Sequence, residues 1–398
     1  GPYHDLAMRW LAHDESKNPE LAVFTQINTA TNLDEFLAAL DQFQTPAQNF
    51  AYADRAGNIA LRIGGQLPLR AEGHGKFVLD GARSANGWPG FIPPRHNPVV
   101  INPERGFVAS ANQRSTDTDY PYFYVGGRYF EDYRGRILNE KLQQMRNITV
   151  SDMQALQLDC ESLKAREFLP HLLGVLDQAS LGGPALAVYD TLANWDYRYR
   201  ASSLAPVYWE ELYGNFYELV WDEFDAIPDS VAIVRPESWR TIDLAINQPA
   251  SEVFDRVATP AKEQFDDIVR LAFGQAVDSI EALPDDLTNW GHYRLVTIRH
   301  LANVAPFNVT IDRAPGDGDA LNATGSGSGP SWRMVVHLTD PIEAWVVYPG
   351  GQSGNPGSAH YDEMIGAWTA GTYYQAQFAT SPEDLETSRA FTLQSRSR

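Results

Sequence analysis

One asparagine stands where the sequence can aim an amide side chain at a reacting group. Val99–Ile101 and Phe107–Ala111 are β-rich runs on either side of a turn with Pro103 and Gly106, and this pattern predicts a hairpin that ends at Asn112. An Asn at a strand end beside a gap can direct its NH2 group at negative charge that develops in a reaction. An Asn in this position is also a common turn residue that bonds its own backbone. The local pattern leaves both roles open.

Signatures of other catalytic centres do not occur in the sequence. The nine histidines are scattered, without an HExxH helix or a cluster of metal-ligand spacing. The sequence has no GxSxG elbow and no Walker loop. Cys160 is the only cysteine, which excludes a disulfide within this chain, and its helical surroundings favour a packed apolar role over a nucleophile. These patterns predict no metal site.

Apolar side chains at helical spacing predict the helices. Residues 31–46 are expected to form a helix that Thr31 or Asn32 caps and Pro46 ends. A capping-box pattern at Thr149–Asp152 opens a longer helical region. Further amphipathic stretches lie at 185–195, 204–226 and 252–282. The middle of the chain is therefore predicted to be a helical lobe.

Strands are predicted on both sides of this lobe. Asn49–Asp54 and Asn58–Ile63 form a second hairpin, in which Gly57 supplies the positive φ of the turn. We expect Phe107–Ala111 to be their neighbour in one sheet, and the Gly- and Pro-rich residues 71–97 to be a long loop that serves or covers a site. Strands return at 293–298, 333–338 and 344–348, with the Gly/Ser-rich residues 325–330 as a loop inside the fold.

This order of elements predicts an α+β layered fold with a helical insert lobe. We expect a sheet-core part at residues 1–145, the helical lobe at 146–290, and return strands with a C-terminal segment at 291–398. The sequence has 51 acidic and 31 basic residues, a formal charge of −20, which argues against nucleic acid or an anionic membrane as the main partner. No apolar run reaches the roughly 18 residues that a membrane-spanning helix needs.

Short motifs in a fixed order give the chain a family resemblance. It resembles the nucleophile-bearing β chain of the penicillin acylase family, which are N-terminal-nucleophile amidohydrolases. The motifs extend over nearly the whole chain: Leu6–Trp10, Gln48–Asp54, Gly57–Ile59, Pro68–Arg70, Ala111–Gln113, Asp119–Pro121, Tyr133–Ile137, Asp152–Gln157, Pro330–Arg333, Gly350–Gly354 and His360–Tyr361. The resemblance implies the αββα four-layer sandwich of the N-terminal-nucleophile hydrolases.

The resemblance also implies a mechanism and a departure from it. Family members attack an amide with a Ser, Cys or Thr that becomes the first residue after self-cleavage, and its own α-amine is the base. Gly1 has no side chain that could attack. We therefore expect the chain to be the C-terminal part of the catalytic chain, with the nucleophile on an upstream segment, and to be inactive alone.

Two site residues follow from matching family positions. The family places an Asn after the small-residue strand as an oxyanion donor, which corresponds to Asn112. It places an Arg about twenty residues later, close to this Asn, which corresponds to Arg134. Many members have two residues between this Arg and a following Arg-Ile, where this chain has only Gly135, so Arg136 is the alternative register. A surface pair of the Arg with Glu131 or Asp132 is the purely structural alternative.

Other matching positions are assigned supporting roles. Arg70 is predicted to bind substrate, Asn49 to brace the sheet, and His74 to brace the loop rather than act as a base. The family's structural calcium is not expected here, because the position of a ligand carboxylate after Asp-Tyr-Pro holds Tyr122, Phe123 and Tyr124. No cofactor is expected.

The resemblance implies an acylase that hydrolyses the amide of an N-acylated small molecule, such as a β-lactam or an N-acyl homoserine lactone. Its expected partners are this substrate and the upstream or α-chain segment. A role in antibiotic metabolism and a periplasmic or secreted location follow from the family alone. The alternatives are a scaffold or binding protein on the acylase fold that lacks a nucleophile, and a glycan-binding protein, which only the aromatic residues favour.

Overall fold

The structure is a computed structural model, and it describes residues 5–15, 18–71, 74–75, 78–117, 119–123, 132–228, 233–379 and 381–384. The chain divides into two compact units, which are described separately. Unit 1 consists of residues 1–146, 162–193 and 211–278, and unit 2 of residues 147–161, 194–210 and 279–398. No helix in the described part of the chain is long and apolar enough to cross a membrane. The division at residues 145 and 290 stays a prediction.

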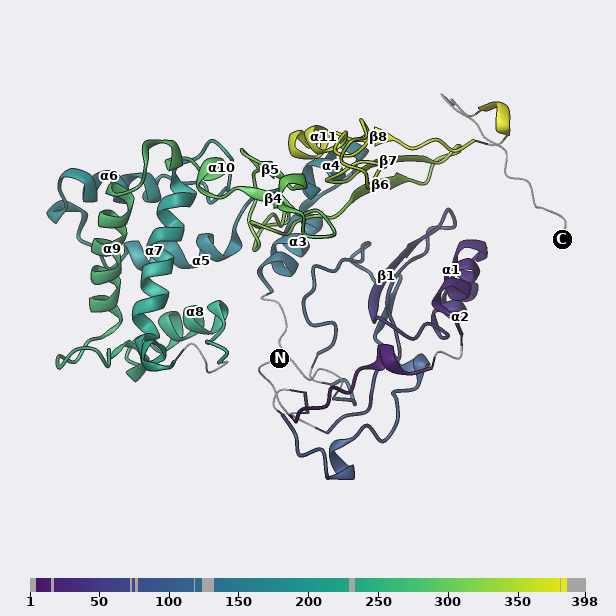
Figure 1. Cartoon of the computed structure of the whole chain (residues 1–398), viewed down its shortest axis with the longest axis horizontal. Coiled ribbons are helices and arrows are strands. Elements are labelled where there is room, and N and C mark those ends of the chain that lie inside the picture. The colour runs from purple at the N-terminus through teal and green to yellow at the C-terminus, as the bar shows by residue number, and fades with distance from the viewer. Residues whose placement is uncertain are drawn as a thin grey trace. The chain divides into compact units, whose positions relative to one another are not determined.

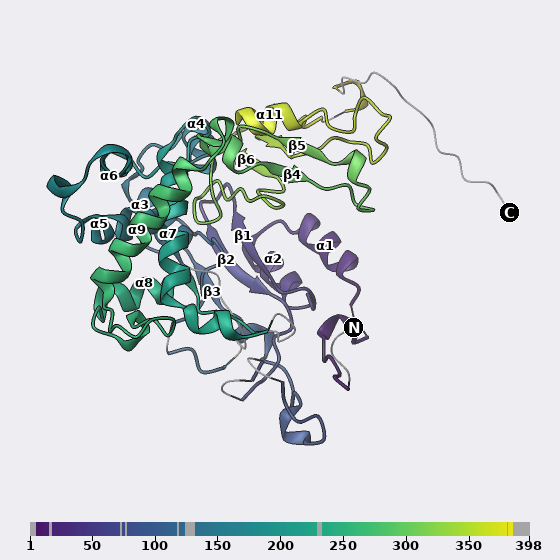
Figure 2. The same ribbon diagram turned by 60° about the vertical axis from the view of Figure 1, so that its left-hand side comes forward.

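A helix pair and a three-stranded antiparallel sheet open unit 1. The helices are α1 (Glu20–Thr29) and α2 (Leu33–Leu40), and the sheet has the order β1-β2-β3, with strands Gln48–Ala53, Ile59–Gly64 and Val99–Ile101. Both helices lie beside β1 (Figures 1 and 2). Phe36 of α2 packs on Tyr52 of β1 at a ring distance of 4.9 Å, so these helices cover one face of the sheet.

The predicted first helix and hairpin form, with one change of length. Asn32 caps α2 by accepting the backbone N–H of Glu35, and Gly57 has a φ of +91° in the β1–β2 turn. The helix ends at Leu40, ahead of Pro46, because the next backbone N–H groups bond to carbonyls three residues back, Gln42 to Ala39 and Phe43 to Leu40. The helix α1 was not predicted.

The predicted strand Phe107–Ala111 is wrong. The third strand of the sheet is β3, which pairs Val99 with Arg62 and Ile101 with Ala60 of β2. Residues 107–111 have no strand partner in the described part of the chain. Their backbone is held by a side chain instead, since Gln113 accepts the N–H of Ala111 through Oε1 at 2.7 Å. We call Phe107–Ala111 the strap.

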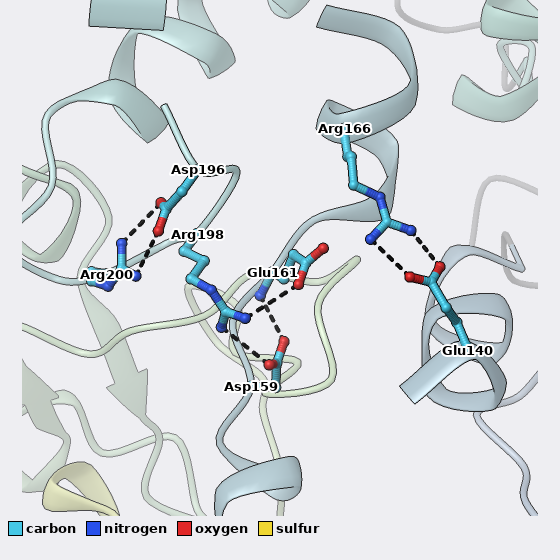
Figure 3. A network of polar contacts seen from close by, with 7 residues as sticks. All are labelled: Glu140, Asp159, Glu161, Arg166, Asp196, Arg198 and Arg200. Carbon is cyan, nitrogen blue, oxygen red and sulfur yellow. Dashed lines mark hydrogen bonds and ion pairs between the residues drawn. The ribbon is translucent and has the colours of Figure 1, made fainter. Parts of the chain in front are cut away.

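Unit 1 also contains the helices α3 (Tyr133–Gln144), α5 (Leu163–Leu173), α6 (Gly183–Ala193), α8 (Ser238–Asn247), α9 (Phe265–Glu281) and most of α7 (Ala205–Val220). Buried aromatic rings pack these helices together, with Phe168 of α5 5.4 Å from Phe216 of α7. Arg166 of α5 binds Glu140 of α3, with 3.1 Å between Nη1 and Oε1 (Figure 3). This ion pair links the helix that bears Arg134 to the helical core.

Unit 2 contains α4 (Val150–Gln157), α10 (Trp290–Tyr293), α11 (Ile365–Ala370) and two small antiparallel sheets. One sheet pairs β4 (Val296–Ile298) with β5 (Val309–Ile311), and the other has the order β6-β7-β8, with strands Arg333–His337, Glu343–Val347 and Tyr374–Gln375. The predicted return strands correspond to β4, β6 and β7, and the short β5 and β8 were not predicted. Thr149 and Asp152 form the predicted capping box of α4. Residues 325–330 are a loop, closed by a bridge between Gly325 and Ser328.

Unit 2 contains an ion-pair cluster next to the buried Cys160. Arg198 binds Asp159 at 3.1 Å and Glu161 at 3.2 Å (Figure 3). Cys160 is buried beside this cluster, and desolvation raises the pKa of its thiol. The predicted packed role of Cys160 is thus what the structure has, because a buried thiol with a raised pKa is a poor nucleophile.

Candidate active site

Asn112 directly follows the strap and has a left-handed backbone, with a φ of +67°. Asn adopts this conformation more readily than most residues because its short polar side chain can bond locally. The strap residues Ala109 and Ser110 are half-buried, whereas Asn112 itself is exposed. The chain therefore turns at Asn112 and presents its side chain outward from a packed segment.

Arg134 contacts the side chain of Asn112. Its Nη2 lies 3.0 Å from Oδ1 of Asn112, and Arg134 belongs to the first turn of α3. A guanidinium group has only donors, so the amide atom that faces it has to be the oxygen. The NH2 group of Asn112 consequently points away from Arg134, and it has no acceptor among the residues that the structure describes.

The structure places the alternative arginine, Arg136, elsewhere. Arg136 binds Glu167 through Nη1 at 2.8 Å and Asp132 through Nε at 3.1 Å. The surface pairing that was considered for Arg134 is thus observed for Arg136, while Glu131 lies outside the described residues. Of the two arginines, Arg134 is the one that the fold brings to Asn112. Its catalytic role, like that of Asn112, stays a prediction.

A cavity of about 560 Å³ lies beside the strap. Its floor is one face of the sheet, where Asn49, Leu61 and Val100 lie on neighbouring strands, and its walls include Ser110 and Gln113. Asn49 donates from Nδ2 to Oγ of Ser110 at 2.9 Å, which ties β1 to the strap rather than to another strand of the sheet. Its predicted role as a brace of the sheet stays a prediction. The lining is mixed, with charged side chains at Arg105, Arg114, Asp117 and Asp119.

Sequence reasoning missed the residues that fix the strap to α3. Arg105 donates to the carbonyl of Phe107 at 3.0 Å and to Oδ1 of Asn139 at 2.9 Å, and Asn139 donates to the carbonyl of Gly135 at 2.7 Å. These residues have no motif of their own. Gln113 and Gly135, which also lie at the contact between the strap and α3, could have been found only from their positions directly after Asn112 and Arg134.

Arg70 and His74 line a different cavity in unit 1, of about 710 Å³. Its described lining shares no residue with the cavity beside the strap. Two guanidinium groups lie over the ring of Trp88 there, with 5.4 Å from its centre to Arg70 and 4.6 Å to Arg9. Burial lowers the pKa of Arg70. The structure does not bring Arg70 to Asn112, and its predicted role in substrate binding is left as a prediction.

The Asp-Tyr-Pro stretch is followed by tyrosines where the family resemblance implies a carboxylate ligand for calcium. Tyr120 and Tyr122 there bond to His96, with 2.9 Å from the Tyr120 hydroxyl to the His96 carbonyl and 2.6 Å between the Tyr122 hydroxyl and His96 Nδ1. Tyr124 lies outside the described residues. Within the described ranges, no group of three or more His, Cys, Asp or Glu side chains is arranged to hold a metal ion.

Comparison with known proteins gives this geometry a context. The family model described as penicillin amidase matches residues 1–384. Acyl-homoserine lactone acylase QuiP of Pseudomonas syringae pv. tomato is 26% identical over 406 residues, which is 94% of this chain and 49% of the relative. Penicillin acylase 2 proenzyme of Pseudomonas sp. strain SE83 is 25% identical over 346 residues, 81% of this chain and 43% of the relative. The chain thus spans about half the length of the curated relatives that it matches.

A solved structure supports the fold. The thermostable penicillin G acylase from Alcaligenes faecalis superposes with a TM-score of 0.65 at 17% identity, over 94% of this chain and 73% of that one. This likeness confirms the predicted α+β fold of the N-terminal-nucleophile hydrolases. Together with the family model over nearly the whole length, it shows that the chain belongs to the penicillin amidase family.

Proposed function

We propose that this chain is part of an acylase that hydrolyses the amide bond of an N-acylated small molecule. The attacking Ser, Cys or Thr is supplied by a segment upstream of residue 1, and its own α-amine removes the proton. Asn112 donates its NH2 group to the oxyanion that forms when the nucleophile adds to the carbonyl. Arg134 holds Asn112 in the orientation that this donation needs.

The contact between Arg134 and Asn112 is the observation that carries this proposal. An amide that only packed in a turn could face either way, but the 3.0 Å bond from a cation to Oδ1 assigns one orientation. The same bond draws electron density toward the oxygen, which makes the NH2 hydrogens better donors. Removing one such donor from an oxyanion site typically costs about 3 kcal/mol of transition-state stabilisation.

The names of the relatives support a substrate class for this proposal. Their names include acyl-homoserine lactone acylase and penicillin acylase, which both denote cleavage of an acyl group from an amine. We propose an N-acyl homoserine lactone or an acylated β-lactam as the substrate, and with the latter a role in antibiotic metabolism. We also propose that the enzyme acts in the periplasm or outside the cell, which fractionation of the source cells with a cytosolic marker enzyme tests.

Complementation tests the proposal. The 398-residue chain alone and the same chain joined to its upstream segment are assayed with a chromogenic acyl 4-nitroanilide, an N-acyl homoserine lactone and a penicillin. We expect hydrolysis only when the upstream segment is present. Turnover by the chain alone would overturn the proposed origin of the nucleophile. A folded, complemented protein without turnover of any of the three would favour a scaffold that kept the fold and lost the activity.

A further inference from the structure

Gln113 directly follows Asn112 and bonds to the backbone of the strap. Its Oε1 accepts the backbone N–H of Ala111 at 2.7 Å, and its Nε2 lies 3.5 Å from the carbonyl of Ala109. The side chain therefore reaches back over Asn112 and bonds to the residues that precede it. These bonds take the place of strand pairing for the end of the strap.

The same side chain lies against the helix that bears Arg134. Gly135 is buried, and a Cβ atom at Gly135 would lie 3.1 Å from Cβ, Cδ and Oε1 of Gln113. Such a distance is tighter than an ordinary van der Waals contact, so the absence of a side chain at Gly135 allows Gln113 to sit where it does. Gly135 directly follows Arg134, and Gln113 directly follows Asn112, so this contact lies next to both residues of the proposed site.

Other bonds hold the strap at Phe107 and, through Asn49 Nδ2 and Ser110 Oγ, at the residue before Ala111, but they do not involve the backbone N–H of Ala111. Arg105 and Asn139 connect the carbonyl of Phe107 to the first turn of α3. Between this connection and Asn112, Gln113 is the side chain that bonds the last backbone N–H of the strap. Loss of Gln113 therefore frees the backbone of Ala111, the residue before Asn112, while Asn49 still holds the side chain of Ser110.

We propose that Gln113 is a positioning residue for the oxyanion donor, and that it acts through the distance between Asn112 and Arg134. This inference rests on the proposed function. A donor has to lie within about 0.5 Å of its productive place to stabilise the transition state fully. Without Gln113 the NH2 group of Asn112 remains present but is displaced, so kcat falls while substrate binding in the ground state changes little.

The test uses the complete enzyme, which carries this chain with its upstream segment, and an acyl 4-nitroanilide as substrate. Gln113→Met keeps the length of the side chain and removes both hydrogen bonds, and we expect a roughly 10- to 100-fold lower kcat with an almost unchanged KM. Gln113→Glu keeps the oxygen that accepts the N–H of Ala111, and its charge lies near the N-terminus of α3, which favours anions. This variant should therefore retain most of the kcat. Gln143→Met, an exposed position on the same helix, is the matched control and should behave as wild type.

A double-mutant cycle separates positioning from stability. In the Asn112→Ala background, Gln113→Met should have no further effect on kcat, because the group that it positions is gone. An equal fall in kcat in both backgrounds, or a normal kcat for Gln113→Met, would overturn the proposal. Failure of the proposed function itself gives a different result, since Asn112→Ala alone would then leave kcat unchanged.

Gly135→Ala supplies a second variant, in which the side chains of Asn112, Gln113 and Arg134 are all unchanged. Alanine favours the helix more than glycine does, so we expect no loss in the thermal midpoint. The added methyl group displaces Gln113 by a few tenths of an ångström and should lower kcat in the wild-type background only. An unchanged kcat for Gly135→Ala together with a normal Gln113→Met would show that the contact has no role in catalysis.

Discussion

Substitution of Asn112 in the complete enzyme is the most direct test of the site. The structure gives the expected cost in stability: Asn112 is exposed, and within the described residues its side chain makes one bond, to Arg134, worth about 1 kcal/mol. Alanine at a φ of +67° adds roughly 1 kcal/mol of backbone strain. Loss of an oxyanion donor, by contrast, lowers kcat by about 10²–10³ with little change in KM. The catalytic loss should thus exceed what the folded fraction can explain.

Two further variants at this position separate the loss of stability from the loss of kcat. Asn112→Gly removes the amide without backbone strain, so kcat should fall as far as in Asn112→Ala while the thermal midpoint falls less. Asn112→Asp places a carboxylate beside Arg134, which strengthens that bond, but it replaces a donor with an acceptor. We expect its midpoint to be at least that of wild type and its kcat to be as low as that of Asn112→Ala.

The assay measures kcat, KM and thermal midpoint on the same preparations. Asn303→Ala is the matched control, because Asn303 is also exposed and has a φ of +54° but lies outside the site. It should share the backbone strain and keep the wild-type kcat. A normal kcat with a lowered midpoint in Asn112→Ala would identify Asn112 as a turn residue and refute the assignment.

Three other predictions concern charged and buried groups. Arg134→Lys should lower kcat about tenfold without unfolding the protein, because an ammonium group lacks the planar donors that orient an amide, and an unchanged kcat would contradict this. The thiol of Cys160 should not react with a thiol reagent at pH 8 until urea unfolds the chain, because burial raises its pKa; rapid labelling of the folded chain would contradict its packed role. The bond from Arg166 lowers the pKa of Glu140, so this pair stabilises the fold above the unfolded pKa of about 4.3 and loses its effect as the pH falls through the lower folded value. The loss of stability with falling pH should therefore be shallower in Glu140→Gln than in wild type. Identical pH profiles of stability would show that the pair of Glu140 and Arg166 does not stabilise the fold.

Local signals predicted the elements whose ends are set by neighbouring residues. The caps at Asn32 and Thr149 and the positive φ at Gly57 are bonds or conformations within a few residues of each other, and all occur in the structure. The strap is different, because β-rich composition describes a surface that fits a sheet but not whether a partner strand is there. Among the described residues, side chains take the place of pairing: Gln113 binds the N–H of Ala111, Arg105 the carbonyl of Phe107 and Asn49 the side chain of Ser110. No periodicity could indicate these contacts.

The choice between Arg134 and Arg136 shows why helix geometry was needed to find which arginine contacts Asn112. Spacing along the chain could not separate them, since they are two positions apart and both lie within the same short motif, Tyr133–Ile137. In a helix, however, residues two apart face in nearly opposite directions. Arg134 accordingly meets Asn112, and Arg136 meets the carboxylates of Asp132 and Glu167. Arg136 of α3 binds Glu167 of α5, and Arg166 of α5 binds Glu140 of α3, so two ion pairs anchor α3 to α5. These ion pairs lie on one face of α3, and Arg134 lies on the opposite face. We therefore expect the ion pairs to affect catalysis only by changing the direction of the Arg134 guanidinium.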